Sequence, residues 1–361
     1  MKKVTNVPNL RFPGFEGEWN REKIGHILTI GSGKDYKHLS EGTIPVFGTG
    51  GYMTSVDDFL YEGESVCIGR KGTINKPSYF NGKFWTVDTL FYTHSFKNIL
   101  PKFVYNIFEQ INWLKYNEAS GVPSLSKSTI EQIDINIPCV DEQQKIATFL
   151  SLIDERIQTQ NKIIEELGVL KSAMAKKIFS QKLRFKVDNQ ENFFIWKERK
   201  LGEIAVKKSS NISANSLEEN HGEYKVYGAS GLLKLIDFYK EIEPYIAIVK
   251  DGAGVGKLFL CEEKSSVLGT LDILKNKEMS DLKFLYYLLS TLDFSKFMTG
   301  STIPHIYFKD YSNEIIGLPA HEEQQKIASF LSTIDTKIDT ETQLLQKLEE
   351  QKRFLLQQMF V

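Results

Sequence analysis

Two long stretches of the chain repeat apolar residues at spacings of three, four and seven positions, the pattern of a helix that packs along one seam. The first stretch covers 138–181 and the second covers 319–361. Each predicts one helix of about 38 residues, roughly 57 Å long at about 1.5 Å per residue. The seam residues are Ile146, Leu150, Ile153, Ile157, Ile164, Leu167, Met174 and Ile178 in the first stretch, and Ile327, Leu331, Ile334, Ile338, Leu345, Leu348, Leu355 and Met359 in the second.

Polar residues interrupt both seams and indicate how the two helices pair. A parallel pair in matched register would place Lys171 against Lys352, two like charges. An antiparallel pair whose facing residue numbers add to 512 places Lys171 against Glu341 and Gln160 against Lys352 instead. In the same register Ile157 faces Leu355, Ile164 faces Leu348 and Leu167 faces Leu345. Polar seam residues often specify register and orientation.

We therefore predict an intramolecular antiparallel coiled coil. The alternative is two amphipathic helices, each packed only on its own domain. The residues predicted to pair are Ile153, Ile157, Gln160, Ile164, Leu167, Lys171 and Met174 of the first helix, and Ile338, Glu341, Leu345, Leu348, Lys352, Leu355 and Met359 of the second.

The two helical stretches are copies of each other. Aligning 138–179 with 319–360, an offset of 181 residues, gives 17 identities in 42 positions. Weaker matches upstream keep nearly the same offset, for example Trp19 with Trp196. The period is therefore one domain plus one helix, repeated once, which predicts a pseudo-two-fold molecule.

The segments before each helix predict two mixed α+β domains. They are rich in Phe, Tyr, Ile and Val, and short apolar runs such as Tyr245–Val249 alternate with glycine-containing turns. Each also holds a helical patch, near Pro101–Tyr116 and Asp281–Phe297. The predicted order is a first α+β domain at 1–137, a spacer helix at 138–181, a second α+β domain at 182–318 and a second spacer helix at 319–361, with Lys182–Asn192 as the link after the first helix.

Composition excludes several classes of protein. The chain is 41% hydrophobic and 25% charged, as globular proteins are. No apolar run approaches the roughly 20 residues of a membrane span, and no secretory signal is visible, so we expect a cytoplasmic protein that contacts no membrane. Three widely spaced cysteines fit a reducing compartment. The net charge of −1 lacks the basic footprint of most nucleic-acid binders, so any DNA binding must rest on local patches or on a basic partner.

No catalytic motif emerges from the sequence. Gly252–Lys257 lacks the spacing of a phosphate-binding loop and the Ser or Thr after its lysine. Six histidines and three cysteines show no metal-ligand spacing. Glu142–Lys145 is better explained as a solvated helix start than as a nuclease acid–lysine pair, and the motifs of amino-methyltransferases are not found. We predict a chain without catalytic residues, cofactor or metal of its own.

Three pairs of loops, one of each pair in each domain, carry the candidate binding residues. In the first pair, Ile68–Thr73 corresponds to Val249–Gly254, and basic side chains beside backbone N–H groups suit a phosphate or a base edge. The second pair is Ala119–Lys127 with Thr299–Tyr307, and the third is Thr49–Tyr52 with Ala229–Leu232. Solvated hairpin tips and plain connections are the alternatives, and Asp251 either accepts from cytosine or caps a turn. The candidate DNA-binding residues are Lys34, Tyr36, Lys37, Thr49, Tyr52, Arg70, Lys71, Thr73, Ser120, Ser124 and Lys127 in the first domain, and Ser230, Lys250, Lys257, Ser301, Thr302, His305 and Lys309 in the second.

Taken together, these residues resemble the specificity subunit of type I restriction–modification enzymes. The most specific part is the doubled motif at Ile137–Asp154, which begins again at Leu318 and Pro319. The openings of the two domains fit as well, with Trp19 before Lys23–Ile27 and Trp196 before Lys200–Ile204, and so does Asn9–Phe15. The resemblance covers essentially the whole chain.

The resemblance implies that each α+β domain is a target-recognition domain for one half of a bipartite site in double-stranded DNA. It implies that the helices set the spacing and dock two modification subunits, which bind S-adenosylmethionine and methylate an adenine in each half-site. Restriction subunits that use ATP and Mg²⁺ would join the same complex. A repeated spacer with two divergent domains predicts an asymmetric target. The competing interpretation is a non-catalytic coiled-coil scaffold with two sugar- or peptide-binding domains, which would lack salt-sensitive binding to duplex DNA.

Overall fold

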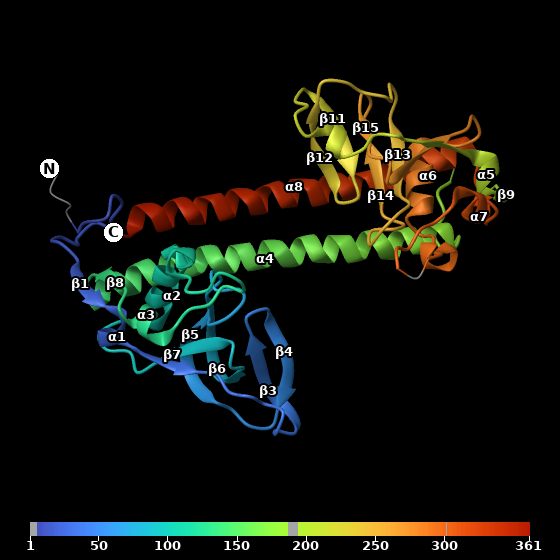
Figure 1. Ribbon diagram of the computed structural model, residues 1–361. Helices are drawn as coiled ribbons and strands as arrows, with labels where there is room; N and C mark the ends of the chain where they lie inside the picture. The colour runs from blue at the N-terminus through green and yellow to red at the C-terminus, as the bar shows by residue number, and fades with distance from the viewer. Residues whose placement is uncertain (1–5, 187–193, 301) are drawn as a thin grey trace. The chain divides into compact units, whose positions relative to one another are not determined.

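The computed structural model describes residues 6–186, 194–300 and 302–361 (Figure 1). The chain divides into two compact units, Met1–Asn161 with Gln343–Val361 (unit 1) and Lys162–Thr342 (unit 2). Each unit combines one globular domain with parts of the two long helices, α4 (Val140–Phe179) and α8 (His321–Met359). The mixed α+β class with two long helices is confirmed. None of the described helices is both long and apolar enough to cross a membrane.

The globular part of unit 1 is built on a six-stranded sheet in the order β2-β7-β5-β6-β3-β4. All neighbours are antiparallel except β3 and β6, which run parallel. Strands β1 and β8 form a separate antiparallel pair at the entry and exit of the domain. The strands are β1 (Asn20–Lys23), β2 (Thr29–Ser32), β3 (Glu41–Gly48), β4 (Gly51–Val56), β5 (Tyr61–Gly69), β6 (Ser78–Thr86), β7 (Leu90–His94) and β8 (Asp134–Ile137).

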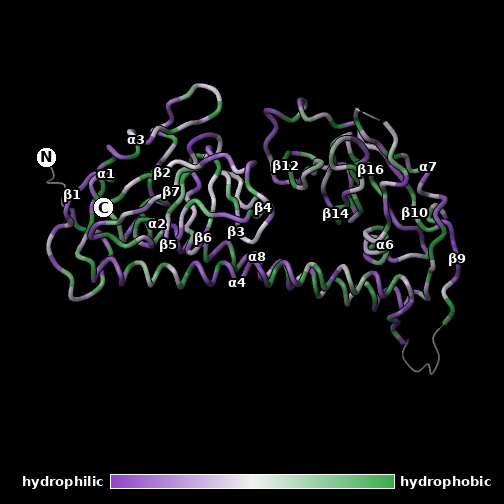
Figure 2. Tube along the Cα trace, turned by 90° about the horizontal axis from the view of Figure 1, so that it is seen from below, coloured by the Kyte–Doolittle hydropathy of each residue, from purple (hydrophilic) through white to green (hydrophobic). Residues whose placement is uncertain are grey.

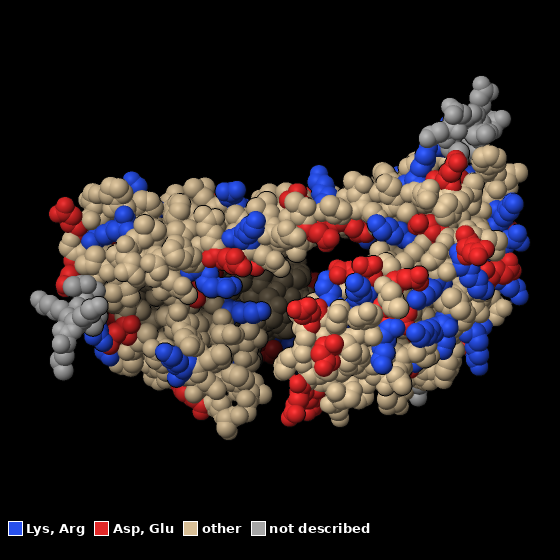
Figure 3. Space-filling model, turned by 90° about the horizontal axis from the view of Figure 1, so that it is seen from above, with Lys and Arg blue, Asp and Glu red and all other residues tan. Residues whose placement is uncertain are grey.

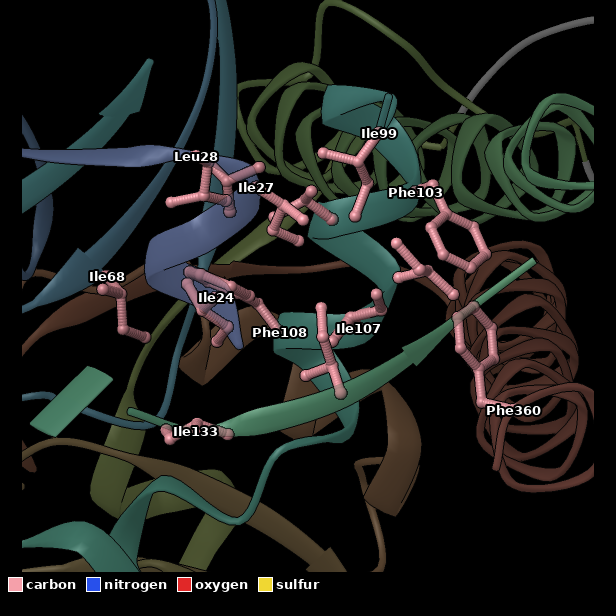
Figure 4. Close-up of a cluster of buried hydrophobic side chains, with 14 of the residues drawn as sticks. Ile24, Ile27, Leu28, Ile68, Ile99, Phe103, Ile107, Phe108, Ile133 and Phe360 are labelled. Carbon is pink, nitrogen blue, oxygen red and sulfur yellow. The ribbon is translucent and has the colours of Figure 1, made fainter. Parts of the chain in front are cut away.

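Short helices cover this sheet and complete the hydrophobic core. They are α1 (Ile24–Ile27), α2 (Pro101–Gln110), the 3₁₀ helix η1 (Trp113–Tyr116) and α3 (Lys127–Glu131). Helix α2 begins with a proline, which needs no hydrogen-bond partner for its nitrogen at that position. Figure 4 shows its buried face, Phe103, Ile107 and Phe108, directed toward residues of α1 and toward Phe360. The rings of Phe103 and Phe360 stack with centroids 5.2 Å apart, which joins the C-terminal residues to this core.

Unit 2 repeats the same strand order with one interruption. Its strands run β10-β16-β13-β14 in one sheet and β15-β11-β12 in a second, so the long β6 of unit 1 is replaced by the two shorter strands β14 and β15. Strands β9 and β17 pair as β1 and β8 do. The strands are β9 (Lys197–Lys200), β10 (Ala205–Ser209), β11 (Tyr224–Gly228), β12 (Gly231–Ile236), β13 (Tyr245–Val249), β14 (Leu258–Cys261), β15 (Ser266–Val267), β16 (Leu271–Asn276) and β17 (Ile315–Leu318).

The helices of unit 2 follow the same plan as those of unit 1. They are α5 (Leu201–Ile204), η2 (Asn215–Leu217), α6 (Leu282–Leu289), η3 (Phe294–Phe297) and α7 (Phe308–Tyr311). Helix α6 starts at a side-chain cap, because Asp281 Oδ1 accepts a hydrogen bond from Phe284 N at 2.8 Å. The predicted helical patches near Pro101–Tyr116 and Asp281–Phe297 thus each hold an α-helix followed by a 3₁₀ turn.

The two long helices pack antiparallel on a shared apolar seam, as predicted. In unit 1, Ile146 and Leu150 near the start of α4 share one core cluster with Leu355 and Met359 near the end of α8. In unit 2 the ends are exchanged, and Ile178 of α4 shares a cluster with Ala175, Ile327, Ala328 and Leu331. The hydropathy colouring of Figure 2 shows apolar and polar residues interspersed along the long helical trace labelled α4.

The predicted partners of the two seam lysines are wrong. Lys171 Nζ lies 2.5 Å from Asp335 Oδ1 in place of Glu341. Lys352 Nζ lies 2.6 Å from Asp154 Oδ1 in place of Gln160. Each lysine therefore meets an aspartate six positions before the residue predicted to face it, close to one heptad, and a heptad shift returns apolar positions to the seam.

The globular domains explain this shift. Lys352 also binds Glu109 of α2, with Nζ and Oε1 2.6 Å apart, and lies 5.4 Å from the ring centroid of Tyr105. Lys171 lies 5.9 Å from the ring centroid of Tyr286, the equivalent tyrosine of unit 2. Each lysine thus has one aspartate partner in the other long helix and further contacts in its globular domain, and the comparison of seam positions alone takes account of neither.

Each long helix is anchored to its globular domain by a glutamine in its first turn. Gln143 Nε2 donates to the carbonyls of Pro138 and Asn98 at 2.9 and 3.0 Å, and its Oε1 accepts from Leu100 N at 3.0 Å. Gln324 makes the same three hydrogen bonds, to the carbonyls of Pro319 and Met279 and from Asp281 N. The repeated Glu-Gln-Gln motif is thus a structural anchor as well as a helix start.

A second anchor, missed in the sequence, is a Leu-Arg-Phe segment found at Leu10–Phe12 and again at Leu183–Phe185. Arg11 binds Glu142 through Nε and Nη2, both at 2.8 Å. Arg184 binds Glu323 in the same way, at 2.7 and 2.9 Å. The described part of the predicted link Lys182–Asn192 therefore packs on the start of α8, and the rest of that link lies outside the described residues.

Candidate nucleic-acid interface

Two of the predicted loops in unit 1 are joined by backbone hydrogen bonds into one surface. The turn after β5 donates from Gly72 N to the carbonyl of Pro123 at 2.8 Å, and Leu125 N donates back to the carbonyl of Arg70 at 2.9 Å. Gly72 has φ +95°, a conformation that glycine adopts without strain. Arg70–Thr73 and Ala119–Lys127, predicted as separate candidates, thus form one structural element.

This element presents exposed cations around a shallow depression. Arg70, Lys71 and Lys127 line it together with Asp88 and Ser124. Arg70 and Lys71 are exposed, and neither forms an ion pair among the described residues. The guanidinium of Arg70 makes a long hydrogen bond of 3.4 Å to the carbonyl of Asp88. These two side chains are therefore available to an external anion or base edge.

The third predicted loop, at the β3–β4 turn, borders the same surface. A Cβ on Gly72 would lie 3.6 Å from Thr49 Oγ1. A neighbouring depression is lined by Tyr36, Lys37, Thr49 and Thr89. Lys34 is exposed and precedes Asp35 and Tyr36, which line this depression, and its carbonyl accepts a hydrogen bond from Trp85 Nε1 at 2.8 Å. The candidates of unit 1 therefore lie on adjoining loops.

Sequence reasoning missed the residues at the centre of this surface, Asp88 and Thr89. They form the turn between β6 and β7, and both line the two depressions. The carbonyl of Thr89 accepts from Arg70 N at 2.7 Å. A signal was present, because Val87–Leu90 matches Leu268–Leu271 at an offset of 181 residues with the threonine kept.

Unit 2 repeats the backbone framework bond for bond. Lys250 N donates to the carbonyl of Thr270 at 3.0 Å, and Gly252 N donates to the carbonyl of Pro304 at 2.9 Å. Ile306 N donates to the carbonyl of Lys250 at 3.0 Å. A Cβ on Gly254 would lie 3.5 Å from the carbonyl oxygen of Ala229, in the β11–β12 turn. All three predicted loop pairs thus occupy equivalent places in the two units.

The side chains on this common framework differ between the units. Lys250 is half-buried and lies 3.2 Å from Asp272, which also lies 3.7 Å from Lys207. The position equivalent to Asp272 in unit 1 is Phe91, so Arg70 has no such internal counter-ion. Lys250 is therefore partly neutralised within its own unit, whereas Arg70 is not.

The other candidates of unit 2 lie around the same loops. Lys257, Ser230 and Thr302 are exposed, and Ser301 lies outside the described residues. His305 is half-buried, with its ring centroid 4.9 Å from that of Tyr307. Lys309 lies 5.3 Å from the same tyrosine ring, in the short helix α7. In unit 1, Thr73 is half-buried and Ser120 is exposed. The candidate residues of both units therefore include hydroxyl groups as well as cations.

Charge over the molecule is mixed in sign. Figure 3 shows Lys and Arg interspersed with Asp and Glu on the face in view. Among the described residues, no group of three or more His, Cys, Asp or Glu is arranged to hold a metal ion. Any anion that this surface binds must therefore be held by individual side chains, because the face in view has no broad positive field.

Comparison with known proteins decides the family. A sequence model described as the type I restriction modification DNA specificity domain matches the chain twice, at residues 16–168 and 195–350. The chain belongs to this family. The two matches correspond to the two halves of the tandem repeat.

Individual relatives of the type I specificity family agree with this assignment. The chain is 28% identical over 278 residues to the type I restriction enzyme MjaVIII specificity subunit of Methanocaldococcus jannaschii, a match that covers 66% of this chain and 64% of that protein. It is 24% identical over 383 residues to the putative MjaX specificity subunit of the same organism, covering 95% of this chain and 88% of the relative.

Solved structures of the type I family share the fold. The S subunit of the type I restriction–modification system from M. genitalium superposes with a TM-score of 0.66 at 19% identity, covering 98% of this chain and 99% of that one. A chain from a type I system studied for complex assembly and conformational transition gives a TM-score of 0.52 at 13% identity, covering 97% and 98%. At these identities the likeness concerns the fold alone.

Proposed function

We propose that this chain is the DNA-sequence specificity subunit of a type I restriction–modification complex, in which each unit recognises one half of an asymmetric bipartite target. The observation that carries the proposal is the pair of equivalent loop surfaces. The same backbone framework holds Arg70 and Lys71 in unit 1 and Lys250 and Asp251 in unit 2. One framework with two sets of side chains is what recognition of two different half-sites requires.

In this proposal the long helices set the distance between the half-sites and dock two modification subunits. Those subunits bind S-adenosylmethionine and methylate an adenine in each half-site, and restriction subunits that use ATP and Mg²⁺ join the complex. The specificity chain supplies base and phosphate contacts and no catalytic group. The modest charge of the chain is consistent with partner subunits that help to enclose the duplex.

The decisive experiment maps methylated adenines in cells that carry the complete system. Arg70→Ala is expected to relax the sequence preference in one half of the target, and Lys257→Ala in the other half. The loss of a base or phosphate contact by Arg70→Ala should lower methylation of the native target by roughly 5- to 150-fold, which corresponds to about 1–3 kcal/mol. Lys97→Ala, which removes an exposed cation just after β7 and outside these loops, is the matched control.

Two outcomes would contradict the proposal. If both variants relax the same half of the target, or neither does, the units do not each recognise one half-site. If the assembled complex shows no salt-sensitive binding to duplex DNA, phosphate contacts are not being made, and the scaffold function becomes the better explanation.

A further inference from the structure

The β3–β4 and β11–β12 hairpins end in exposed apolar side chains that no described part of the chain covers. On β4, Tyr52 is 64% exposed and Met53 is 51% exposed. On β12, Leu232 is 53% exposed and Leu233 is 46% exposed. Single exposed apolar residues are common, but here two consecutive ones recur at the same place in both units.

Strand geometry makes this exposure informative. Met53 is the extra residue of a bulge, because Phe47 pairs with Tyr52 and Val46 pairs with Thr54. Leu233 is the extra residue at the same place in β12. Both β4 and β12 are the outermost strands of their sheets. A hairpin tip at the edge of a sheet that carries two exposed apolar side chains fits a narrow groove better than it fits a flat protein surface.

The two hairpins have the same construction. Their two-residue turns are closed by the pairs Gly48–Gly51 and Gly228–Gly231. In each hairpin the register shifts just before the turn, between Val46 and Phe47 in unit 1 and between Val226 and Tyr227 in unit 2. A bulge of this kind increases the local twist of the strand. Gly51 and Gly231 have φ values of +105° and +107°, so both turns depend on glycine at that position.

Cationic loops flank each tip. In unit 1, Thr49 at the turn lies against Gly72 of the Arg70–Thr73 loop, and Met53 lines one depression with Lys37 and Thr89. In unit 2, the carbonyl of Ala229 lies against Gly254 of the loop that ends at Lys257. An apolar tip between cations matches a duplex groove, where phosphates line both edges and base edges with thymine methyl groups form the floor.

We propose that the tips of the β3–β4 and β11–β12 hairpins enter a groove of the target duplex and contact base edges there. Tyr52 and Met53 do so in unit 1, and Leu232 and Leu233 do so in unit 2. The inference rests on the proposed function and adds to it which further elements reach the bases, beside the contacts that Arg70, Lys71 and Lys257 make at the groove edge.

The difference between the tips sets the kind of recognition that each provides. The hydroxyl of Tyr52 lies 3.0 Å from Ser55 Oγ and has capacity for a further hydrogen bond to a base. Leu232 and Leu233 have no polar atom in their side chains, so this tip distinguishes bases by apolar contact alone, above all with thymine methyl groups. The half-site of unit 2 should therefore depend on thymine at the contacted positions.

The test uses the complete complex and two double variants, Tyr52→Ser with Met53→Ser and Leu232→Ser with Leu233→Ser. The matched controls are Leu114→Ser in unit 1 and Val206→Ser in unit 2, whose side chains are 56% and 48% exposed and lie outside the hairpins. Three readouts are compared: co-purification of the modification subunits, the salt dependence of binding to a duplex carrying the mapped target, and the genome-wide map of methylated adenines.

Each tip variant is expected to assemble normally and to keep the salt dependence of binding, because the phosphate contacts remain. Methylation of the native target should fall about tenfold or more, and only one half of the target should lose its preference. For the unit 1 variant, that half is the one that Arg70→Ala relaxes. The controls should leave the methylation map unchanged.

The possible failures are distinguishable. Loss of the modification subunits from a tip variant would mean that the tip docks a protein, and an unchanged methylation map would mean that the tip contacts no base; either result overturns this inference. If Arg70→Ala still relaxes one half of the target, the proposed function survives that result. If Arg70→Ala and the tip variants all leave the map unchanged, the proposed function fails as well.

Discussion

Replacing Arg11 or Arg184 with alanine compares the two equivalent anchors of the long helices. Each arginine binds a glutamate through two hydrogen bonds of 2.7–2.9 Å. The side chains of Glu142 and Glu323 are both 1% exposed, so either substitution leaves a carboxylate buried away from water. Both arginines also donate to a backbone carbonyl at 2.6 Å, that of Gly17 for Arg11 and that of Phe194 for Arg184, so this loss is shared.

The two glutamates differ in what still binds them. Without Arg184, Glu323 keeps hydrogen bonds from Trp196 Nε1 at 3.1 Å and Phe185 N at 3.3 Å. For Glu142, the described residues offer no donor beyond Arg11, and the equivalent Trp19 Nε1 is buried without a hydrogen-bond partner among them. The removal of Arg11 should therefore cost more than the removal of Arg184.

The magnitudes follow from the energetics of buried ion pairs. Removing one partner of such a pair costs about 3–5 kcal/mol, and we expect Arg11→Ala to lower the free energy of unfolding of unit 1 by this amount. Hydrogen bonds to the remaining carboxylate recover part of the loss in unit 2, so Arg184→Ala should cost about 2–3 kcal/mol.

Native-state amide hydrogen exchange separates the two effects, because amides at the start of α4 report on unit 1 and those at the start of α8 report on unit 2. Adding Glu142→Gln to Arg11→Ala removes the stranded charge and should recover about 1–2 kcal/mol. A cost for Arg184→Ala equal to or above that for Arg11→Ala would refute the reasoning, since it would mean that the donors from Trp196 and Phe185 do not stabilise the carboxylate.

Two further predictions concern buried groups. Burial raises the pKa of the Cys67 and Cys261 thiols to about 12, whereas Cys139 is exposed, so a thiol reagent at neutral pH should label about one cysteine in the native chain and three after denaturation. Burial also raises the pKa of Glu109, and the nearby Lys352 opposes that rise. Lys352→Met should therefore raise the pKa of Glu109 further and cost about 2–4 kcal/mol at neutral pH. A carboxyl group whose pKa is raised in the folded state destabilises the fold increasingly as pH rises. Denaturant unfolding should therefore show that the variant loses free energy of unfolding, relative to the unsubstituted protein, by an amount that grows from about pH 4 upward. A loss that does not depend on pH would contradict the assignment.

The helices were predictable because their signal is local and doubled. The seam from Ile146 to Ile178 repeats from Ile327 to Met359, and apolar spacing alone identifies an amphipathic helix. The antiparallel orientation was predictable because a parallel pair in matched register would place the like charges of Lys171 and Lys352 together. Their true ion-pair partners were missed because only seam positions were compared. Asp154 and Asp335 directly follow the seam residues Ile153 and Ile334, and Glu109 belongs to a globular domain.

The loops were only partly predictable. Arg70 and Gly72 stood out because a basic residue before a glycine recurs in both copies. That the loop bonds to Pro123 and Leu125 depends on non-local pairing, for which single-sequence patterns carry little signal. Asp88 and Thr89 were missed although Val87–Leu90 repeats as Leu268–Leu271, since a four-residue turn has no periodicity that marks it. The two Leu-Arg-Phe segments were missed because the distance between them in the sequence differs from the 181 residues that separate the two long helices.

The kind of hydrogen bond used at each place explains why some segments of the two halves are alike and others are not. The helix anchors are held by side chains, since Gln143 and Gln324 each satisfy three backbone groups, and no other side chain of that length offers both an acceptor and two donors. Those positions must therefore keep the same residue in both copies.

The candidate binding loops are held differently, by backbone-to-backbone hydrogen bonds such as Gly72 N to Pro123 O and Gly252 N to Pro304 O. A bond between backbone groups leaves the side chains of neighbouring residues free to change, provided that glycine remains where φ is positive. The pair Arg70 and Lys71 in one unit and Lys250 and Asp251 in the other can thus occupy one framework at little cost in stability. A fold built this way separates the residues that determine its shape from those proposed to contact DNA, which accounts for loops that diverge between anchors that stay the same.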